Sequence, residues 1–269
     1  MSEEDWYASN RDWWDARVPV HAASEFYGLD AFVSDPGATT LRPFEVEEVG
    51  DVAGRTLVHL MCHFGLDTLS WARRGAEVVG LDLSPAAVEA ATGAAERAGL
   101  DARFVAANVY DAVEAVEGRT FDVVYTGFGA LTWLPDMVRW ARVMAALTAP
   151  GGMLYLAEFH PVHNIFSDDD LTVTHPYFHE GPLVFDEAGT YADLDVTIEA
   201  TRVYEWNHGL GEVLSAVLDA GFTIELFHEH DFTLFQRWPF LEKEGRDTYR
   251  LPAGMPSLPL MYSLRARKD

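Results

Sequence analysis

Residues 56–84 read TLVHLMCHFGLDTLSWARRGAEVVGLDLS, and this stretch decides the fold. Two short apolar runs, at 56–62 and 77–83, predict buried strands. Between them, residues 68–74 predict a helix that Asp67 can cap at its start. A strand, a helix and a second strand in so few residues are typical of a parallel pair joined by a crossover helix. We therefore expect this unit to open the sheet.

The same alternation continues through most of the chain. Ser84, Pro85 and Gly99 have the residue types favoured at an N-cap, at a first helical position and at a helix end, so they bound a second helix. Near-continuous apolar strands separated by helices favour a parallel sheet that is covered on both faces. Further strands are expected at 102–108, 121–126, 153–159, 223–232 and 259–267, and further helices at 136–147 and from Leu210 to Gly221, with Leu210, Val213, Leu214, Val217 and Leu218 on one face.

Two segments interrupt this pattern. Residues 160–204 mix prolines, acidic residues and aromatics without a regular period, and we interpret them as an insertion after the fifth strand. Residues 1–45 carry several large aromatic side chains, among them Trp13 and Trp14. We expect this amino-terminal segment to form a helical or irregular cover over the edge of the sheet, while residues 46–269 form the main domain.

The composition restricts the possible partners. The chain has 269 residues, 49% of them hydrophobic, which is enough for one large core. Its 43 acidic residues against 19 Lys and Arg give a formal charge of -24, which would repel nucleic acid and anionic membranes, although solubility alone also accounts for it. The acidic residues 3–5 are unlike a signal peptide, no stretch has the roughly 20 apolar residues of a membrane span, and Cys62 is the single cysteine. We therefore expect a cytoplasmic protein without disulfides.

The loops after the first two strands are the expected ligand site, because an open α/β sheet binds ligands beyond the carboxyl ends of its strands. The second loop carries Asp82 at the tip of its strand, about 20 residues after the first turn. A carboxylate in that place can accept hydrogen bonds from both hydroxyls of a ribose. Helix capping is the alternative role, but Ser84 is the better cap, so ribose binding is favoured.

At these positions the sequence resembles the class I S-adenosylmethionine-dependent methyltransferases, over roughly residues 56–269. Residues 58–65 resemble the first motif of the family, and Asp82 resembles its ribose-binding acid. Residues 108–109 stand where the family contacts adenine, and residues 149–152 resemble its Pro-Gly-Gly element. Residues 65–68 and 133–136 are similar to versions found in a bacterial branch that acts on small molecules.

The resemblance implies a fold and a cofactor. The fold is a seven-stranded, mostly parallel, Rossmann-like sheet with helices on both faces and an antiparallel last strand. An amino-terminal cover and an insertion after the fifth strand, at about residues 160–204, complete it. S-adenosylmethionine is the implied cofactor.

The first motif departs from the family pattern. The family usually has an acid and three glycines there, whereas His59 stands at the acid and Met61 and His63 replace two glycines, leaving Gly65. Glycine serves such loops by its positive φ or by allowing close backbone approach. We therefore expect a re-formed loop that still offers backbone groups to the methionine end of the cofactor.

The predicted cofactor residues follow from this comparison, and three of the positions have structural alternatives. Asn108 can form a turn instead of contacting adenine. Cys62 is interpreted as a small buried residue and not as a nucleophile, and His59 as a core histidine with satisfied hydrogen bonds. The predicted set is Met61, Cys62, His63, Gly65, Thr68, Asp82, Leu83, Asn108, Val109 and Thr126.

The methyl acceptor is expected to bind in an aromatic pocket formed by the later loops and the insertion. Its predicted wall consists of Trp14, Phe128, Tyr177 and Trp206. His160 is the first choice for a base, followed by His163 and His208, although each of the three can be purely structural. His175 and His179 have i, i+4 spacing, but Pro176 between them and the lack of a local third ligand argue against a metal, and we expect none.

These residues predict transfer of a methyl group to an oxygen, nitrogen or carbon nucleophile of a small molecule, mainly by positioning it in line with the carbon–sulfur bond. Two alternatives stay open, because a protein of this fold can use the same cofactor in a cyclisation, or can bind it without catalysis. Product mass separates methyl transfer from cyclisation. An NAD-dependent oxidoreductase is disfavoured, because no Gly-x-Gly-x-x-Gly fingerprint follows the first strand.

Overall fold

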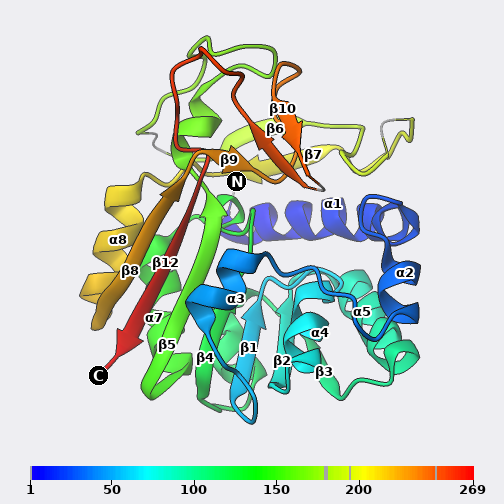
Figure 1. Ribbon diagram of the computed structural model, residues 1–269, viewed down its shortest axis with the longest axis vertical. Coiled ribbons are helices and arrows are strands. Elements are labelled where there is room, and N and C mark those ends of the chain that lie inside the picture. Colours follow the sequence, from blue (N-terminus) through cyan, green and yellow to red (C-terminus); the bar gives the residue numbers. More distant parts are fainter. Residues whose placement is uncertain (1, 179–180, 194, 246) are drawn as a thin grey trace.

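The computed structural model describes residues 2–178, 181–193, 195–245 and 247–269. Its centre is a seven-stranded sheet with the strand order β3-β2-β1-β4-β5-β12-β8 (Figure 1). The pairs from β3 to β5 are parallel, and β12 is antiparallel to both of its neighbours, which confirms the expected fold class. The strands of this sheet are β1 (Thr56–Leu60), β2 (Glu77–Asp82), β3 (Ala102–Ala106), β4 (Phe121–Thr126), β5 (Thr148–Phe159), β8 (Phe222–His230) and β12 (Met261–Lys268).

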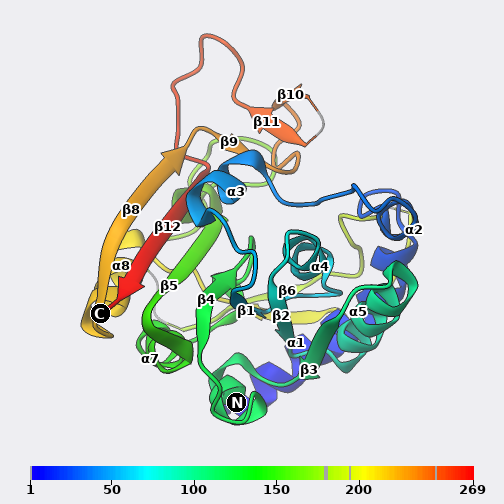
Figure 2. The ribbon, with the colours of Figure 1, turned by 60° about the horizontal axis from the view of Figure 1, so that its bottom comes forward.

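Helices cover both faces of the sheet, and alternate residues of each strand point to opposite faces. Val58 and Leu60 of β1 belong to the core that contains Trp140 of α7. Leu57 of the same strand packs in the core that contains Trp71 of α4. In Figure 2, α3 and α4 lie on one side of the sheet and α7 lies on the other. The helices are α1 (Glu3–Ala23), α2 (Leu29–Ser34), α3 (Pro43–Val49), α4 (Leu66–Arg73), α5 (Pro85–Ala98), α6 (Ala112–Ala115), α7 (Met137–Leu147) and α8 (Leu210–Asp219).

Several predicted helix ends are confirmed. The Ser84 hydroxyl accepts a hydrogen bond from the Ala87 amide at 3.0 Å, Pro85 is the first residue of α5, and Gly99 closes the helix with a φ of 64°. Asp136 caps α7 in the same way, through the Arg139 amide at 2.8 Å. Local capping chemistry is readable in the sequence because it needs no distant partner.

Two helix predictions were wrong. Helix α4 begins at Leu66, after a left-handed Gly65, so Asp67 lies inside the first turn and does not cap it. Its carboxylate accepts a hydrogen bond from the hydroxyl of Thr40 instead. In α8, Leu218 is 53% exposed although its spacing predicted a core position, because Val213 and Val217 already fill the side of the helix that faces the sheet.

The predicted turn at residues 149–152 lies inside β5, which begins at Thr148. Gly151 has a φ of 72°, and the pairing of β4 with β5 jumps from Phe121↔Thr148 to Val123↔Met153. The segment is therefore an irregularity within one strand. A Cβ on Gly152 would lie 2.9 Å from the Ala149 carbonyl oxygen, so the close backbone approach requires glycine.

The insertion and the segment between β8 and β12 form two small sheets beyond the carboxyl ends of the central strands (Figure 1). One is the antiparallel pair β6 (Leu183–Asp186) and β7 (Arg202–Glu205). The other contains β9 (Phe232–Thr233), β10 (Glu242–Glu244) and β11 (Thr248–Arg250). The predicted strand 223–232 is thus divided, because β8 ends at His230.

Helix α1 lies across the carboxyl ends of the strands, beneath the small sheets (Figure 1). Asn10 attaches it to β7, because its side-chain amide donates to the Tyr204 carbonyl at 2.8 Å and accepts from the Tyr204 amide at 2.9 Å. The amino-terminal segment therefore covers the end of the sheet where the ligand site is expected.

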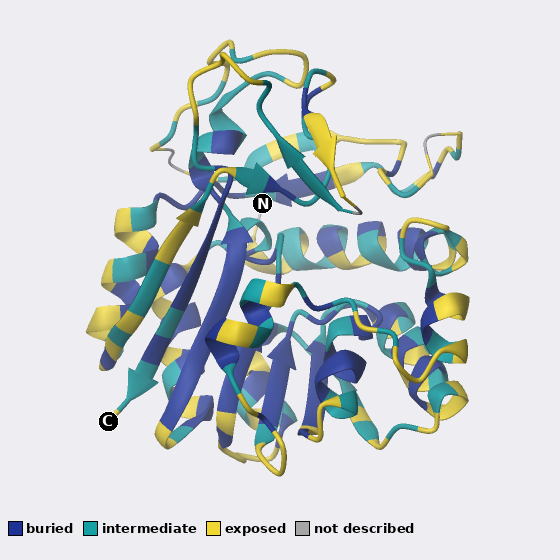
Figure 3. Ribbon diagram, viewed as in Figure 1, coloured by how far each residue is buried: buried dark blue, intermediate teal, exposed yellow. Residues whose placement is uncertain are grey.

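Burial follows this layering. The central strands are mostly buried, whereas the small sheets are more exposed (Figure 3). Within the described residues, none of the helices has both the length and the apolar character needed to cross a membrane.

Candidate functional site

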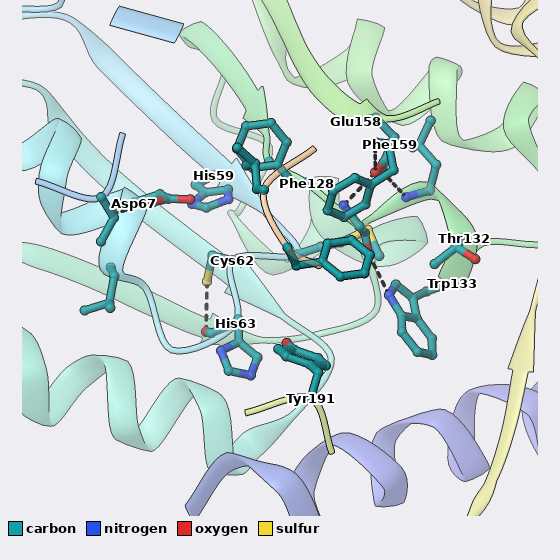
Figure 4. Close-up of a pocket in the computed structure, with 18 of the residues that line it drawn as sticks. His59, Cys62, His63, Asp67, Phe128, Thr132, Trp133, Glu158, Phe159 and Tyr191 are labelled. Atoms are coloured by element: carbon teal, nitrogen blue, oxygen red, sulfur yellow. Dashed lines mark hydrogen bonds between the residues drawn. The ribbon is translucent and has the colours of Figure 1, made fainter. Parts of the chain in front are cut away.

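Two adjoining cavities lie at the carboxyl ends of the strands, one of about 490 Å³ and one of about 140 Å³. Both lie among the loops after β1 and β4 and beside α1, and Figure 4 shows one of these pockets. The residues that line both cavities are Trp14, Tyr27, Met61, His63, Phe128, Gly129, Trp133 and Tyr191.

Asp82 lines the smaller cavity at the tip of β2. One carboxylate oxygen accepts from the His63 amide at 2.7 Å and the other from the Ser84 amide at 2.9 Å. Burial raises the pKa of Asp82 to about 6, against the opposite effect of these backbone hydrogen bonds. The side chain is thus fixed in place, as a ribose-binding carboxylate would need to be. Leu83, Asn108 and Val109 line the same cavity.

Asn108 also shapes the local backbone, which was the structural alternative to contacting adenine. Its side-chain oxygen accepts from the Tyr110 amide at 3.1 Å and caps the short 3₁₀ helix η1 (Val109–Asp111). The capping bond holds the residue at the cavity, so the two interpretations do not exclude one another.

Two residues in the loop after β1 have a left-handed backbone although neither is a glycine. Met61 has a φ of 60° and His63 a φ of 51°, in the region that glycine occupies without strain. Two non-glycine residues of this loop therefore adopt the backbone region that glycine usually occupies. At Gly65, with a φ of 80°, a Cβ would lie 2.6 Å from the Phe104 ring.

A cluster of aromatic rings covers the junction of the two cavities. The His63 ring stacks on Tyr27 at an interplanar angle of 16° and meets Trp14 edge-on, with centroids 5.0 Å apart. Its Nε2 lies 3.3 Å from His21 Nδ1, and burial lowers the pKa of both histidines, to about 4 for His21. Tyr191 joins from the insertion through a hydrogen bond of 2.5 Å between its hydroxyl and that of Tyr27.

The larger cavity receives several predicted residues. Met61, Cys62, His63 and Gly65 line it from the first loop. Burial raises the pKa of the Cys62 thiol well above its usual range, which fits the small buried residue that was expected. From the predicted acceptor wall, Trp14, Phe128 and Trp206 line this cavity as well.

Three of the residues predicted to bind the cofactor or the acceptor lie outside both cavities. Thr68 is buried, with its hydroxyl 2.8 Å from His59 Nδ1, and Thr126 is buried at the end of β4. The Tyr177 hydroxyl accepts from the Leu210 amide at 3.1 Å and so supports the start of α8. His179 is outside the described residues, so its pairing with His175 is not placed.

The three candidate bases occupy different environments. His160, the first choice, lines neither cavity. Its Nδ1 accepts a hydrogen bond from the Val162 amide, and its Nε2 lies 3.1 Å from a carboxylate oxygen of Glu229. His208 lines the larger cavity, but its ring nitrogens contact the Leu134 carbonyl at 2.6 Å and Glu212 at 3.0 Å. Both residues are therefore held in structural hydrogen bonds.

His163 differs from the other two, because it lines the larger cavity and both of its ring nitrogens are buried without a hydrogen-bond partner among the described residues. Its ring stacks on Phe159 at an angle of 26° and meets Phe235 and Trp238 edge-on. Burial, with a smaller effect of Arg237, lowers its pKa to about 3 against the opposite effect of the nearby Asn164 side chain, so the imidazole is neutral. A neutral ring offers one donor and one acceptor.

Several residues that line the larger cavity are not in the predicted sets of site residues. Asp67 was assigned to a helix cap and His59 to the core, yet both line the larger cavity. Glu205, whose pKa burial raises to about 7, lines it from the end of β7. Glu158 shapes one wall, because it accepts four backbone hydrogen bonds of 2.6 to 2.9 Å, three of them from residues 129–131. Glu158 lies next to the last residue of β5, and this position at the carboxyl end of a strand is the signal that could suggest it.

Comparison with known proteins identifies the class. Residues 58–152 match a family described as a methyltransferase domain. A ubiquinone biosynthesis O-methyltransferase of Methylobacterium sp. is 29% identical over 161 residues, which cover 58% of this chain and 61% of that protein. The chain thus aligns with about three fifths of the length of this curated relative.

Solved structures agree on the fold. An S-adenosylmethionine-dependent methyltransferase from Mesorhizobium loti superposes with a TM-score of 0.60 at 22% identity, over 90% of this chain and 100% of that one. The structure of DhpI in complex with SAH superposes with a TM-score of 0.57 at 15% identity, over 100% of this chain and 99% of that one. The chain has the fold of the class I S-adenosylmethionine-dependent methyltransferases, and the class expected from its motifs is confirmed.

Proposed function

We propose that this protein transfers a methyl group from S-adenosylmethionine to a hydroxyl group of a small molecule. The observation that carries the proposal is the pair of adjoining cavities, one with a fixed carboxylate and the other with an unpartnered imidazole. The match to a methyltransferase domain and the O-methyltransferase relative support the same reaction.

The smaller cavity suits a nucleoside. Asp82 can accept hydrogen bonds from ribose hydroxyls, because the His63 and Ser84 amides already orient its carboxylate. Leu83 and Val109 supply apolar contacts beside it, and Asn108 supplies an amide. When bound, S-adenosylmethionine supplies an activated methyl group on a sulfonium, so the residues of this chain have mainly to position the acceptor.

The larger cavity suits an acceptor with an aromatic or apolar body and a hydroxyl group. Phe128, Trp133 and Trp206 provide apolar walls. The neutral His163 can accept a hydrogen bond from the hydroxyl and take its proton as the oxygen–methyl bond forms. As this bond forms, the bond between the methyl carbon and the cofactor's sulfur would break and leave a neutral thioether. His163 would then carry the positive charge as an imidazolium, so charge is conserved. Glu205 and Glu158 line the same cavity, and each favours this cation when its carboxyl group is ionised.

The charge of the chain supports a small-molecule substrate. A formal charge of -24 opposes binding of nucleic acid and of anionic membrane surfaces. We therefore propose a small-molecule acceptor, no nucleic acid partner and a cytoplasmic location.

Calorimetric titration with S-adenosylmethionine and S-adenosylhomocysteine tests the proposal. Both are expected to bind, and Asp82→Ala is expected to weaken binding by about 1 to 3 kcal/mol through the lost ribose hydrogen bonds. A protein that binds neither ligand contradicts the proposal. A screen of hydroxylated aromatic acceptors by mass spectrometry then identifies turnover, because only methyl transfer adds one methyl group to the product.

Once an acceptor is known, His163→Asn tests the base. We expect turnover to fall by about 10² to 10⁴ while the affinity for S-adenosylhomocysteine is unchanged, because the ring lies on the acceptor side. His160→Gln is the matched control, since His160 lies outside both cavities. An equal loss in the two variants would assign both histidines a structural role.

A further inference from the structure

Asp67 lines the larger cavity with a carboxylate that is only partly satisfied. The Thr40 hydroxyl donates to its Oδ1. Its Oδ2 lies 3.7 Å from the point that a Cβ on Gly127 would occupy. Gly127 is the first residue after β4 and also lines the larger cavity. Figure 4 shows the side chain pointing toward the His59 ring. Oδ1 is therefore held by Thr40, whereas no hydrogen bond to Oδ2 is found among the described residues.

This carboxylate has no ion pair with any Lys, Arg or His of the described residues. The Arg42 guanidinium, which also lines the cavity, donates to Asp247 at 2.9 Å instead. Burial raises the pKa of Asp67, with Thr40 and Arg42 acting in the opposite direction. An unpaired carboxylate in a desolvated wall is costly, and a cationic ligand group removes that cost.

His59 reaches the same point of the cavity. Its Nε2 lies 3.6 Å from the point that a Cβ on Gly127 would occupy, and its Nδ1 lies 2.8 Å from the Thr68 hydroxyl oxygen. Burial lowers the pKa of His59 to about 3, so the ring is neutral and adds no repulsion to a cation. When Nδ1–H donates to Thr68, Nε2 carries a lone pair that accepts a hydrogen bond. The Tyr125 hydroxyl lies 3.6 Å from the same position and donates its proton to Glu45. A carboxylate oxygen, an imidazole nitrogen and a hydroxyl oxygen thus surround one small space.

The position of this space relative to Asp82 identifies the ligand group. Asp82 ends β2 and Gly127 follows β4, and β1 lies between these two strands. Two strand spacings separate them, about 10 Å. An extended S-adenosylmethionine spans such a distance between its ribose hydroxyls and its amino group, which is a cation at neutral pH.

We propose that Asp67, with His59 Nε2, binds the amino group of the methionine end of the cofactor. Asp67 then supplies, from the first turn of α4, the negative charge that His59 does not provide at the end of β1. This inference rests on the proposed function, because it presupposes that the cofactor binds with its ribose at Asp82.

Titration with two ligands tests the pairing. S-adenosylhomocysteine carries the amino group, and its deamino analogue lacks only that group. Asp67→Asn is expected to weaken S-adenosylhomocysteine binding at least 10-fold and to leave the affinity for the deamino analogue unchanged. Asp82→Asn is the control, because it is expected to weaken both ligands equally through the ribose.

The outcomes separate this inference from the proposed function. A wild-type protein that does not bind S-adenosylhomocysteine removes the proposed function itself. An Asp67→Asn variant that binds S-adenosylhomocysteine as tightly as the wild type overturns the pairing, and so does an equal loss of both ligands. Thr40→Val adds a second variant, since it removes the partner of Oδ1 and keeps the charge. It is expected to weaken S-adenosylhomocysteine binding less than Asp67→Asn does, and a greater loss contradicts the assignment.

Discussion

Met61 and His63 combine a strained backbone with a central position in the site. Both have left-handed φ values and both line the two cavities. For residues other than glycine this conformation costs on the order of 1 to 3 kcal/mol. The same conformation directs the His63 amide to Asp82 at 2.7 Å. The strain is thus located where the backbone contacts the predicted ribose-binding carboxylate.

Substitution at Met61 measures this strain. With a φ of 60°, Met61→Gly is expected to be more stable than Met61→Ala by about 1 kcal/mol, because only glycine adopts this backbone freely. At Glu89, an exposed position within α5, the order is expected to reverse, with Ala more stable than Gly. Urea unfolding of the four variants checks both orders. If Ala is the more stable residue at position 61 as well, the loop is unstrained there.

Some residues of the site could be predicted from the sequence, and others could not. Asp82 was predictable because its place depends on two adjacent elements, the end of β2 and the cap of α5. Asp67 was not, because the sequence does not show that α4 begins at Leu66 and leaves this carboxylate to the cavity. The separation of His163 from His160 was also not predictable, since it depends on which ring nitrogens distant residues such as Glu229 occupy.

At the scale of elements, α1 connects the insertion to the central sheet. The Arg17 guanidinium donates to the carbonyls of Glu187 at 2.6 Å, Gly189 at 2.9 Å and Ala200 at 2.9 Å, and it stacks on Trp13 with a distance of 3.5 Å to the ring centroid. Thr190 and Tyr191, within this stretch, contact His21 and Tyr27 of the aromatic cluster. Arg17 therefore holds the part of the insertion that covers the junction of the cavities.

The sequence predicted the central sheet but not this arrangement. The strands and helices of the sheet follow from local periodicity and capping, whereas β6 and β7 pair across a long irregular segment. Their position depends on contacts such as the one between Asn10 and Tyr204, which are 194 residues apart. A single guanidinium inside a helix gives no indication in the sequence that it binds three distant carbonyls.

Removal of the Arg17 side chain tests this role. Arg17→Met is expected to lower the free energy of unfolding by about 2 to 4 kcal/mol, because hydrogen bonds to a buried charged group are lost. It is also expected to increase hydrogen exchange within residues 187–200 while the exchange of β1 and β4 stays unchanged. Arg11→Met is the matched control on the same helix, where Arg11 forms a surface ion pair with Asp12. Equal exchange in the two variants would show that Arg17 does not hold the insertion.

At the scale of the whole molecule, an acidic chain keeps several carboxyl groups in its interior. Glu45 is fully buried, accepts from the Tyr125 hydroxyl at 2.5 Å and from the Arg42 amide at 2.8 Å, and has its pKa raised to about 8 by burial and by the nearby Asp67. Burial and Glu187 raise the pKa of Glu205 to about 7. The interior thus favours neutral carboxyl groups around the cavities, apart from those that a bound cation can stabilise.

The raised pKa of Glu45 predicts how stability depends on pH. Above about pH 5 the unfolded chain has released this proton, whereas the folded protein retains it up to about pH 8, so the free energy of unfolding falls as the pH rises through this range. Between pH 7 and pH 8.5 we expect Glu45 to contribute a fall of about 1 kcal/mol, and Glu205, whose pKa is about 7, a smaller one, while the buried histidines with lowered pKa values change little there. Glu45→Gln is expected to remove most of this fall, because an amide does not titrate.

Urea unfolding at the two pH values checks the prediction, with Asp82→Asn as the control. The pKa of Asp82, about 6, lies below this range, so the fall should persist in that variant. A Glu45→Gln protein that loses stability as steeply as the wild type would place the titrating group elsewhere. A wild type whose stability does not change over this range would show that Glu45 is already ionised in the folded protein at pH 7, in spite of its burial against Tyr125.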